Sequence, residues 1–213
     1  QTFFLLSARR YSSDDYLSAK KYFRPTDRSD LATLSFRPTG NREQEPLGYS
    51  REWSGVAKLT NRSIKSVELN YQGIFNVVDA RRANYAFRLD PDGMSKQHTF
   101  SVVHGLDWTQ TLSKTRFYNV SLRQNYFDYK DMVYDDVNDP RYDRAGPPVG
   151  GGDTELGANV QGVDFTRFKQ KTSTIVWKSA IVSQVARDQQ IKVGAEFEWP
   201  RVSFGHPGYL VAT

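Results

Sequence analysis

The chain contains no cysteine among its 213 residues. A disulfide framework, thiol chemistry and cysteine-ligated metal sites are therefore excluded. The chain also has no apolar run approaching the ~18–20 residues that a membrane-spanning helix needs. This excludes a helical membrane protein but leaves open a transmembrane barrel, whose strands are never continuously apolar.

Apolar residues are scarce, at 38% of the chain, whereas aromatic residues reach 14%. A transmembrane barrel needs apolar side chains only at alternate strand positions, and it collects aromatic side chains at its two interfaces. A polar β-sandwich would have similar totals. Composition therefore leaves both architectures open.

The net charge is +5 and the pI is near 9.3. Lysine and arginine are spread along the chain beside aspartate and glutamate, whereas nucleic-acid binding needs them concentrated on one face or helix. We therefore expect a mildly basic surface and no nucleic-acid partner. In a barrel, basic residues at the outer rim would meet phosphorylated lipid head groups.

Apolar and polar residues alternate most clearly near the C-terminus. One set falls on one strand face (Ile191, Val193, Ala195, Phe197, Trp199), and the intervening set falls on the other (Lys192, Gly194, Glu196, Glu198). Alternation with period two, ending in an aromatic residue, is typical of a strand between lipid and water. The alternation over 67–78, with Ile74 and Val78 as exceptions, is longer than the five or six residues usual in a soluble sandwich strand.

Long and short connections alternate between the expected strands. We expect long loops at 11–51, 81–97 and 135–167, short turns at 61–66, 112–115 and 186–190, and a further loop starting at 205. Up-and-down outer-membrane barrels alternate in this way because their periplasmic turns are tight and their outer loops are long. The segment 180–190 also has helical spacing, but its flanks favour a strand and a turn. Seven strands are therefore predicted, at 2–10, 52–61, 67–78, 99–111, 117–134, 172–185 and 191–199.

An acidic cluster lies in the third expected loop, at Asp135, Asp136, Asp139 and Asp143 with Asn138. Hard cations bind several oxygen ligands at close spacing. The spacing here does not match the twelve-residue calcium loop, and Pro140 divides the cluster. We expect a solvated acidic loop, with bound calcium as the alternative.

Three further groups of residues are candidates for metal binding, catalysis or phosphate binding. His98, His104 and His206 are far apart and form no zinc or catalytic pattern. The glycine run 150–152 lacks the lysine and Ser/Thr of a phosphate-binding loop, so a flexible tip is expected. Glu196 and Glu198 share one strand face, which in principle permits a hydrolytic acid pair.

A hydrated pore wall accounts for these two carboxylates more simply. We therefore expect no catalytic residue, cofactor site or metal site, and no enzymatic activity. The sequence alone leaves any ligand-binding residue unknown.

Several segments resemble TonB-dependent outer-membrane receptors, many of which come from the Bacteroidota. The clearest is the hairpin Ser-Gln-Val at 183–185 followed by Ile-Lys-Val-Gly-Ala-Glu-Phe at 191–197. Gln189 or Gln190 stands where the family often has histidine. Segments 112–142, 84–93 and 3–27 fit the same pattern, so the resemblance covers nearly the whole chain.

The resemblance implies a barrel of about 22 strands closed by an N-terminal plug. Such receptors import a scarce nutrient (siderophore, cobalamin, glycan or peptide) across the outer membrane, using energy supplied through TonB. Residues 1–213 would be an internal fragment of the barrel domain, without plug, TonB box or signal peptide. Its partners would be outer-membrane lipid, the TonB complex through the missing part, the nutrient and a possible surface lipoprotein.

The resulting prediction is an all-β, antiparallel up-and-down meander that forms part of a transmembrane barrel wall with long extracellular loops. A soluble all-β carbohydrate-binding or adhesin domain is the alternative, and a porin without a plug would share the wall. Lipid-facing positions are expected at Leu69, Tyr71, Phe75, Leu122, Ile175, Trp177, Val193 and Phe197. Lumen-facing positions are expected at Glu68, Asn70, Gln72, Arg123, Lys192 and Glu196.

Overall fold

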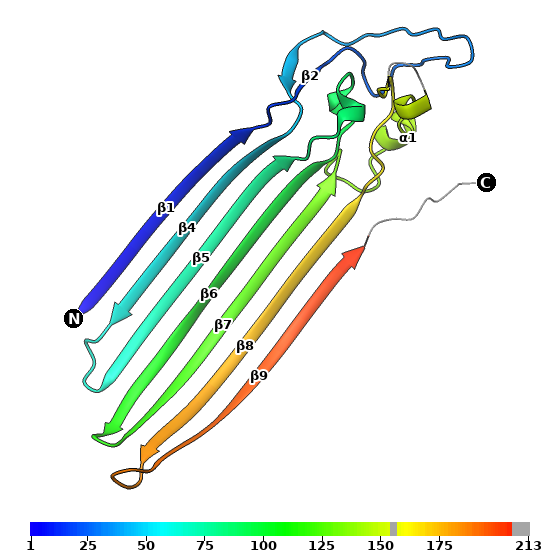
Figure 1. The fold of residues 1–213 in the computed structure, drawn as a ribbon. Coiled ribbons are helices and arrows are strands. Elements are labelled where there is room, and N and C mark those ends of the chain that lie inside the picture. Colours follow the sequence, from blue (N-terminus) through cyan, green and yellow to red (C-terminus); the bar gives the residue numbers. More distant parts are fainter. Residues whose placement is uncertain (154–156, 206–213) are drawn as a thin grey trace.

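The structure is a computed structural model that describes residues 1–153 and 157–205. Seven long strands form one antiparallel sheet in which every strand pairs with its sequence neighbours among the seven (Figure 1). The predicted all-β meander is therefore confirmed, and the sheet is open, with one edge of its first and last strands unpaired. Its strands are β1 Thr2–Asp14, β4 Tyr49–Asn61, β5 Val67–Arg81, β6 Lys96–Ser113, β7 Arg116–Met132, β8 Phe168–Gln184 and β9 Gln190–Gly205.

Most strands extend further toward the long loops than the alternation predicted. The first was expected to end at residue 10 and continues to Asp14, and the sixth was expected from 172 and begins at Phe168. Polar residues at these ends still join the backbone hydrogen-bond ladder, which does not need an apolar side chain. The segment 180–190 is strand and turn, as predicted, because β8 ends at Gln184 and β9 begins at Gln190.

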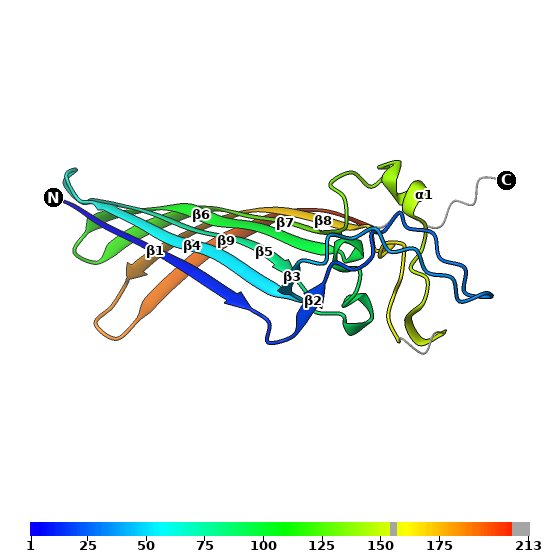
Figure 2. The same ribbon diagram turned by 90° about the horizontal axis from the view of Figure 1, so that it is seen from above.

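The connections alternate as expected between short turns at one end of the sheet and long loops at the other (Figures 1 and 2). The turns are 62–66, 114–115 and 185–189. The long connections are the first loop (15–48), the second loop (82–95) and the third loop (133–167), together called the loop layer. The loop layer contains β2 Ser18–Lys20, β3 Gln44–Pro46, the short 3-10 helices η1 Tyr85–Phe87, η2 Pro91–Gly93 and η3 Gly151–Asp153, and α1 Arg141–Ala145.

The packed core lies in the loop layer and not on the sheet. One buried cluster joins Ala19, Leu47, Phe87 and Met94, and a second joins Tyr142, Ala145 and Val163. By contrast, large apolar side chains in the middle of the sheet are half exposed, such as Leu122 at 50% and Phe197 at 53%. The loops therefore fold against one another, while the sheet leaves its apolar side chains uncovered.

Backbone hydrogen bonds connect each of the three loops to both others. Because buried or half-buried backbone groups need partners, these bonds fix how the loops pass one another. The bonds run from Lys20 N to Arg88 O (2.7 Å), from Gly162 N to Pro25 O (2.8 Å) and from Asn159 N to Ala86 O (2.6 Å).

Gly162 is the tightest point of this arrangement. Its φ is +88°, and a Cβ at this position would lie 2.0 Å from the carbonyl oxygen of Pro147. The left-handed backbone alone disfavours a side chain by about 1–2 kcal/mol, and the overlap adds to that cost.

We therefore expect Gly162→Ala to destabilise the loop layer by about 2 kcal/mol or more. The measurement is the rate of limited proteolysis within 82–95 and 157–167 in the protein that contains this chain. Gly152→Ala is the matched control, because nothing lies within 4 Å of a Cβ there. Equal cleavage rates for the two variants would contradict the expectation.

Candidate functional site: a two-faced sheet below a folded loop layer

The pairing register decides which side chains share a face, because paired residues point to the same side and neighbours along a strand alternate. One face, called the apolar face, carries an apolar residue on all seven strands within a single row. That row is Phe4, Leu59, Tyr71, Leu106, Leu122, Trp177 and Phe197. All four tryptophans of the chain also lie on this face, at Trp53, Trp108, Trp177 and Trp199.

The residues predicted to face lipid and lumen separate onto opposite faces. The apolar face carries all eight of the first set (Leu69, Tyr71, Phe75, Leu122, Ile175, Trp177, Val193, Phe197). The other side, called the polar face, carries all six of the second (Glu68, Asn70, Gln72, Arg123, Lys192, Glu196). The predicted sharing of faces is thus confirmed.

Among residues 1–153 and 157–205, no second sheet covers the apolar face. Leu6 is 79% exposed and Phe4 83%, and the one other sheet among the described residues is the small β2–β3 pair of the loop layer. Contiguous exposed apolar patches on monomeric soluble proteins rarely exceed a few hundred Å². The apolar row that crosses all seven strands is therefore an unusual surface for a protein surrounded by water.

Aromatic residues mark the end of the apolar face nearest the loop layer. Trp53 on β4 and Phe100 on β6 lie in one row, while Trp199 on β9 lies two rows closer to the short turns. Charged residues follow directly on several strands: the Arg10 guanidinium lies 5.3 Å from the Trp53 ring centroid. The shift along the strands is what strands tilted against a flat apolar slab produce.

Ion pairs and polar hydrogen bonds occupy the polar face. Arg123 donates to Asp107 at 2.9 Å, and Lys178 pairs with Glu196 at 2.7 Å. This ion pair engages Glu196, whereas Glu198 lies opposite Val176 in the ladder.

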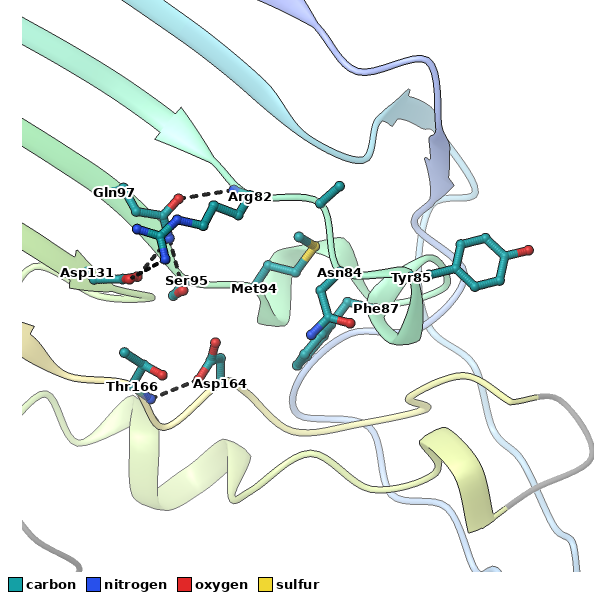
Figure 3. Close-up of a pocket in the computed structure, with 11 residues that line it drawn as sticks. Arg82, Asn84, Tyr85, Phe87, Met94, Ser95, Gln97, Asp131, Asp164 and Thr166 are labelled. Atoms are coloured by element: carbon teal, nitrogen blue, oxygen red, sulfur yellow. Dashed lines mark hydrogen bonds and ion pairs between the residues drawn. The ribbon is translucent and has the colours of Figure 1, made fainter.

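A cavity of about 430 Å³ opens between the second and third loops at the end of the sheet (Figure 3). Within it, Gln97 accepts from the backbone N–H of Arg82 and donates to Asp131 at 2.7 Å. The walls combine polar groups with the rings of Tyr85 and Phe87. Sequence reasoning missed this cavity, because its walls come from two loops and two strand ends.

The acidic cluster of the third loop is held by local hydrogen bonds. Arg141 donates to Asp139 at 2.7 Å and lowers the pKa of that carboxyl to about 2. Asp136 accepts from the backbone N–H of Asn138. Across 1–153 and 157–205, no three metal-ligating side chains are grouped to hold an ion.

Two of the three histidines, His98 and His104, lie within the described residues, both on the apolar side of β6. His98 lies 2.6 Å from Asp79, and His104 lies 3.2 Å from Gln124, three rows further along the same face. His206 lies outside the described residues. One end of the glycine run differs from the expected flexible tip: Gly150 is buried, and a Cβ there would lie 2.4 Å from the Ala158 carbonyl oxygen. At the other end Gly152 is exposed, with nothing within 4 Å of a Cβ.

Asp90 is a fully buried carboxyl in the second loop. Neither of its side-chain oxygens has a hydrogen-bond partner among the described residues. Burial, followed by the charges of Asp92 and Asp27, raises the pKa of Asp90 to about 8. The carboxyl is therefore neutral in the folded loop layer at pH 7, which avoids burying an unpaired charge.

We expect the loop layer to lose stability as pH rises. The unfolded carboxyl ionises near pH 4, whereas the folded one holds its proton until about pH 8. The free energy of unfolding of the loop layer therefore falls as pH rises from about 4 to about 8, by an amount on the order of a few kcal/mol. Above pH 8 this loss is complete and stays constant.

Asp90→Asn should remove most of this dependence, matching the wild type near pH 4 and exceeding it at pH 8–9. Native-state hydrogen exchange of amides in 82–95, corrected for intrinsic rates, measures it. Asp143→Asn, an exposed change in the same layer, should follow the wild-type curve. A parallel pH curve for Asp90→Asn would contradict the assignment.

Within the described part of the chain, no helix is both long and apolar enough to cross a membrane. No family model matches the chain, and neither a curated protein nor a solved structure does. Function must therefore be argued from the geometry of the two faces and the loop layer.

Proposed function

We propose that this chain is part of the wall of a transmembrane β-barrel in a TonB-dependent receptor that imports a scarce nutrient across the outer membrane. One observation carries the proposal: a row of apolar side chains runs unbroken across seven strands, and nothing in the described chain covers it. In this role the apolar face contacts lipid hydrocarbon and the polar face lines a hydrated interior.

The height of the apolar face supports this assignment. On β5 it runs from Val67 to Val77, ten residue steps of about 3.4 Å each. A strand tilted by about 45° covers roughly 24 Å of membrane normal over that length, close to the ≈25 Å band of outer-membrane barrels. Aromatic residues at the loop end supply the expected interfacial girdle.

The polar face fits the lining of a plugged pore. Most of its side chains are polar or charged, and a short apolar patch lies on three strands where Val56, Ile74 and Val103 pair in register. A purely aqueous channel gains nothing from such a patch, whereas a plug packed inside the barrel would cover it. This favours a plugged receptor over an open porin.

The loop layer forms the outer mouth in this proposal. The cavity beside Arg82, Gln97 and Asp131 adjoins the polar face, because Gln97 and Asp131 pair in register on that side. A nutrient entering from outside would pass these groups first. A siderophore, cobalamin, glycan or peptide would suit the receptor class, and TonB and a surface lipoprotein remain its proposed partners.

A soluble carbohydrate-binding or adhesin domain is less well supported. Such a domain would bury the apolar face under a second sheet, and the described residues contain none over it. The proposed role needs no such layer, because lipid covers the face.

Charge substitution at adjacent positions tests the proposal. Tyr71 lies in the middle row of the apolar face, and Gln72 lies beside it on the polar face. Tyr71→Arg should cost about 2–4 kcal/mol, since arginine near the bilayer midplane is disfavoured by that amount, whereas Gln72→Arg should be mild.

Urea titration of the intact protein folded into phosphatidylcholine vesicles measures both free energies of unfolding. Equal costs at the two positions, or a larger cost at Gln72, would remove the support for a lipid-facing surface. The comparison is matched, because both variants introduce the same residue one position apart.

The open edges of the sheet give a second test. Within the described part of the chain, the outward edges of β1 and β9 have no strand partner, and hydrocarbon does not tolerate unpaired backbone groups. We expect residues 1–213 alone to fail to form a monodisperse species inserted in liposomes, as judged by flotation and protease protection. Stable insertion of the isolated chain would contradict a wall that is completed by further strands.

A further inference from the structure

Positively charged residues gather where the apolar face ends and the loop layer begins. They lie on the apolar side of six strands and on α1, and are called the basic border: Arg10, Arg51, Lys96, His98, Lys130, Arg141, Lys169, Lys171 and Arg201. Some have internal partners, such as Arg51 with Asp14 and Lys171 with Asp128. Three lysines do not.

These three are Lys96, Lys130 and Lys169. The described residues place no carboxylate within ion-pair distance of any of them. Lys130 and Lys169 are also directly opposed on neighbouring strands, and His98 lies opposite Lys130 on the other side. Like charges opposite one another destabilise a sheet, so the Lys130–Lys169 pair holds a repulsion that an external anion would relieve.

The surface is hollowed at this row. A cavity of about 540 Å³ lies between the strand ends and the third loop, and Lys96, His98, Lys130 and Arg141 contribute to its walls. Two carboxylates also line it, Asp79 beside His98 and Asp135 near Arg141. The space is large enough for a phosphorylated head group rather than a single small ion.

The position of the cavity favours a lipid over a free phosphate. It opens on the apolar side of the sheet, one row beyond the border aromatic Phe100. A head group held there would have its acyl chains lying along the apolar face below. Lysine side chains reach such a level readily, with apolar stems along the sheet and ammonium groups at the head groups.

We propose that the basic border, centred on Lys96, Lys130 and Lys169, is a binding site for the phosphate groups of lipid head groups in the outer leaflet. This inference rests on the proposed membrane-spanning role. It adds a specific partner to that role: a phosphate-bearing lipid seated at one defined stretch of the wall.

The test uses the intact protein in detergent and native mass spectrometry with diphosphoryl lipid A and with its phosphate-free counterpart. Wild type should retain the phosphorylated lipid preferentially. Each lysine lost near an anionic head group should lower affinity about fivefold, so Lys96→Gln, Lys130→Gln and Lys169→Gln combined should lower it about a hundredfold.

The matched control combines Lys58→Gln, Lys65→Gln and Lys192→Gln. It removes the same charge from two polar-face positions and a short turn, none of which is in an ion pair among the described residues. The control should bind like wild type. Equal loss in both triple variants, or no preference of the wild type for phosphate, would overturn the inference.

A separate measurement tests the membrane role itself. In vesicles of phosphatidylcholine with brominated acyl chains, the quenchable fluorescence should decrease in Trp177→Phe, because Trp177 lies in the middle apolar row. Unchanged quenching would contradict the proposed membrane-spanning role, and the lipid site would fall with it. Quenching at Trp177 without phosphate preference would overturn the lipid site alone.

Discussion

The pairing register of the seven strands is the constraint on which everything else depends. A slip by one residue between any two strands would move that strand's apolar side chains to the opposite face. The register instead aligns Phe4 on the first strand with Phe197 on the last through five intermediate apolar residues. Both the separation of the faces and the basic border follow from this alignment.

Two different kinds of interaction stabilise the sheet and the loop layer. The sheet is held together by backbone hydrogen bonds between its strands. Few of its side chains are buried, so its apolar side chains remain exposed to whatever surrounds the sheet. The loop layer reverses this, with few ladder bonds and a packed interior around Leu47 and Tyr142. The proposed lipid-facing wall would need this division, because loops in water must bury their own apolar core.

The strands and their faces could be predicted because period-two alternation is local and each strand carries it independently. The loop layer could not, because its contacts join distant residues, such as Gly162 with Pro25 and Asn159 with Ala86, which follow no local period. The same reason hid the cavity beside Gln97 and Asp131. Gly150 was misjudged because its role depends on Ala158, and nothing in the glycine run itself indicates that contact.

His104 and Gln124 are two polar residues near the middle of the apolar face, and their placement is informative. They lie opposite one another on β6 and β7, with the imidazole and the amide oxygen 3.2 Å apart. A lone polar group in hydrocarbon costs several kcal/mol, whereas two polar groups within hydrogen-bond distance satisfy part of their hydrogen bonding internally. The ring of Tyr71 lies 6.2 Å from that of His104 and shields the pair further. A sequence that alternates for lipid can thus carry two polar residues at mid-sheet, provided that the register makes them neighbours.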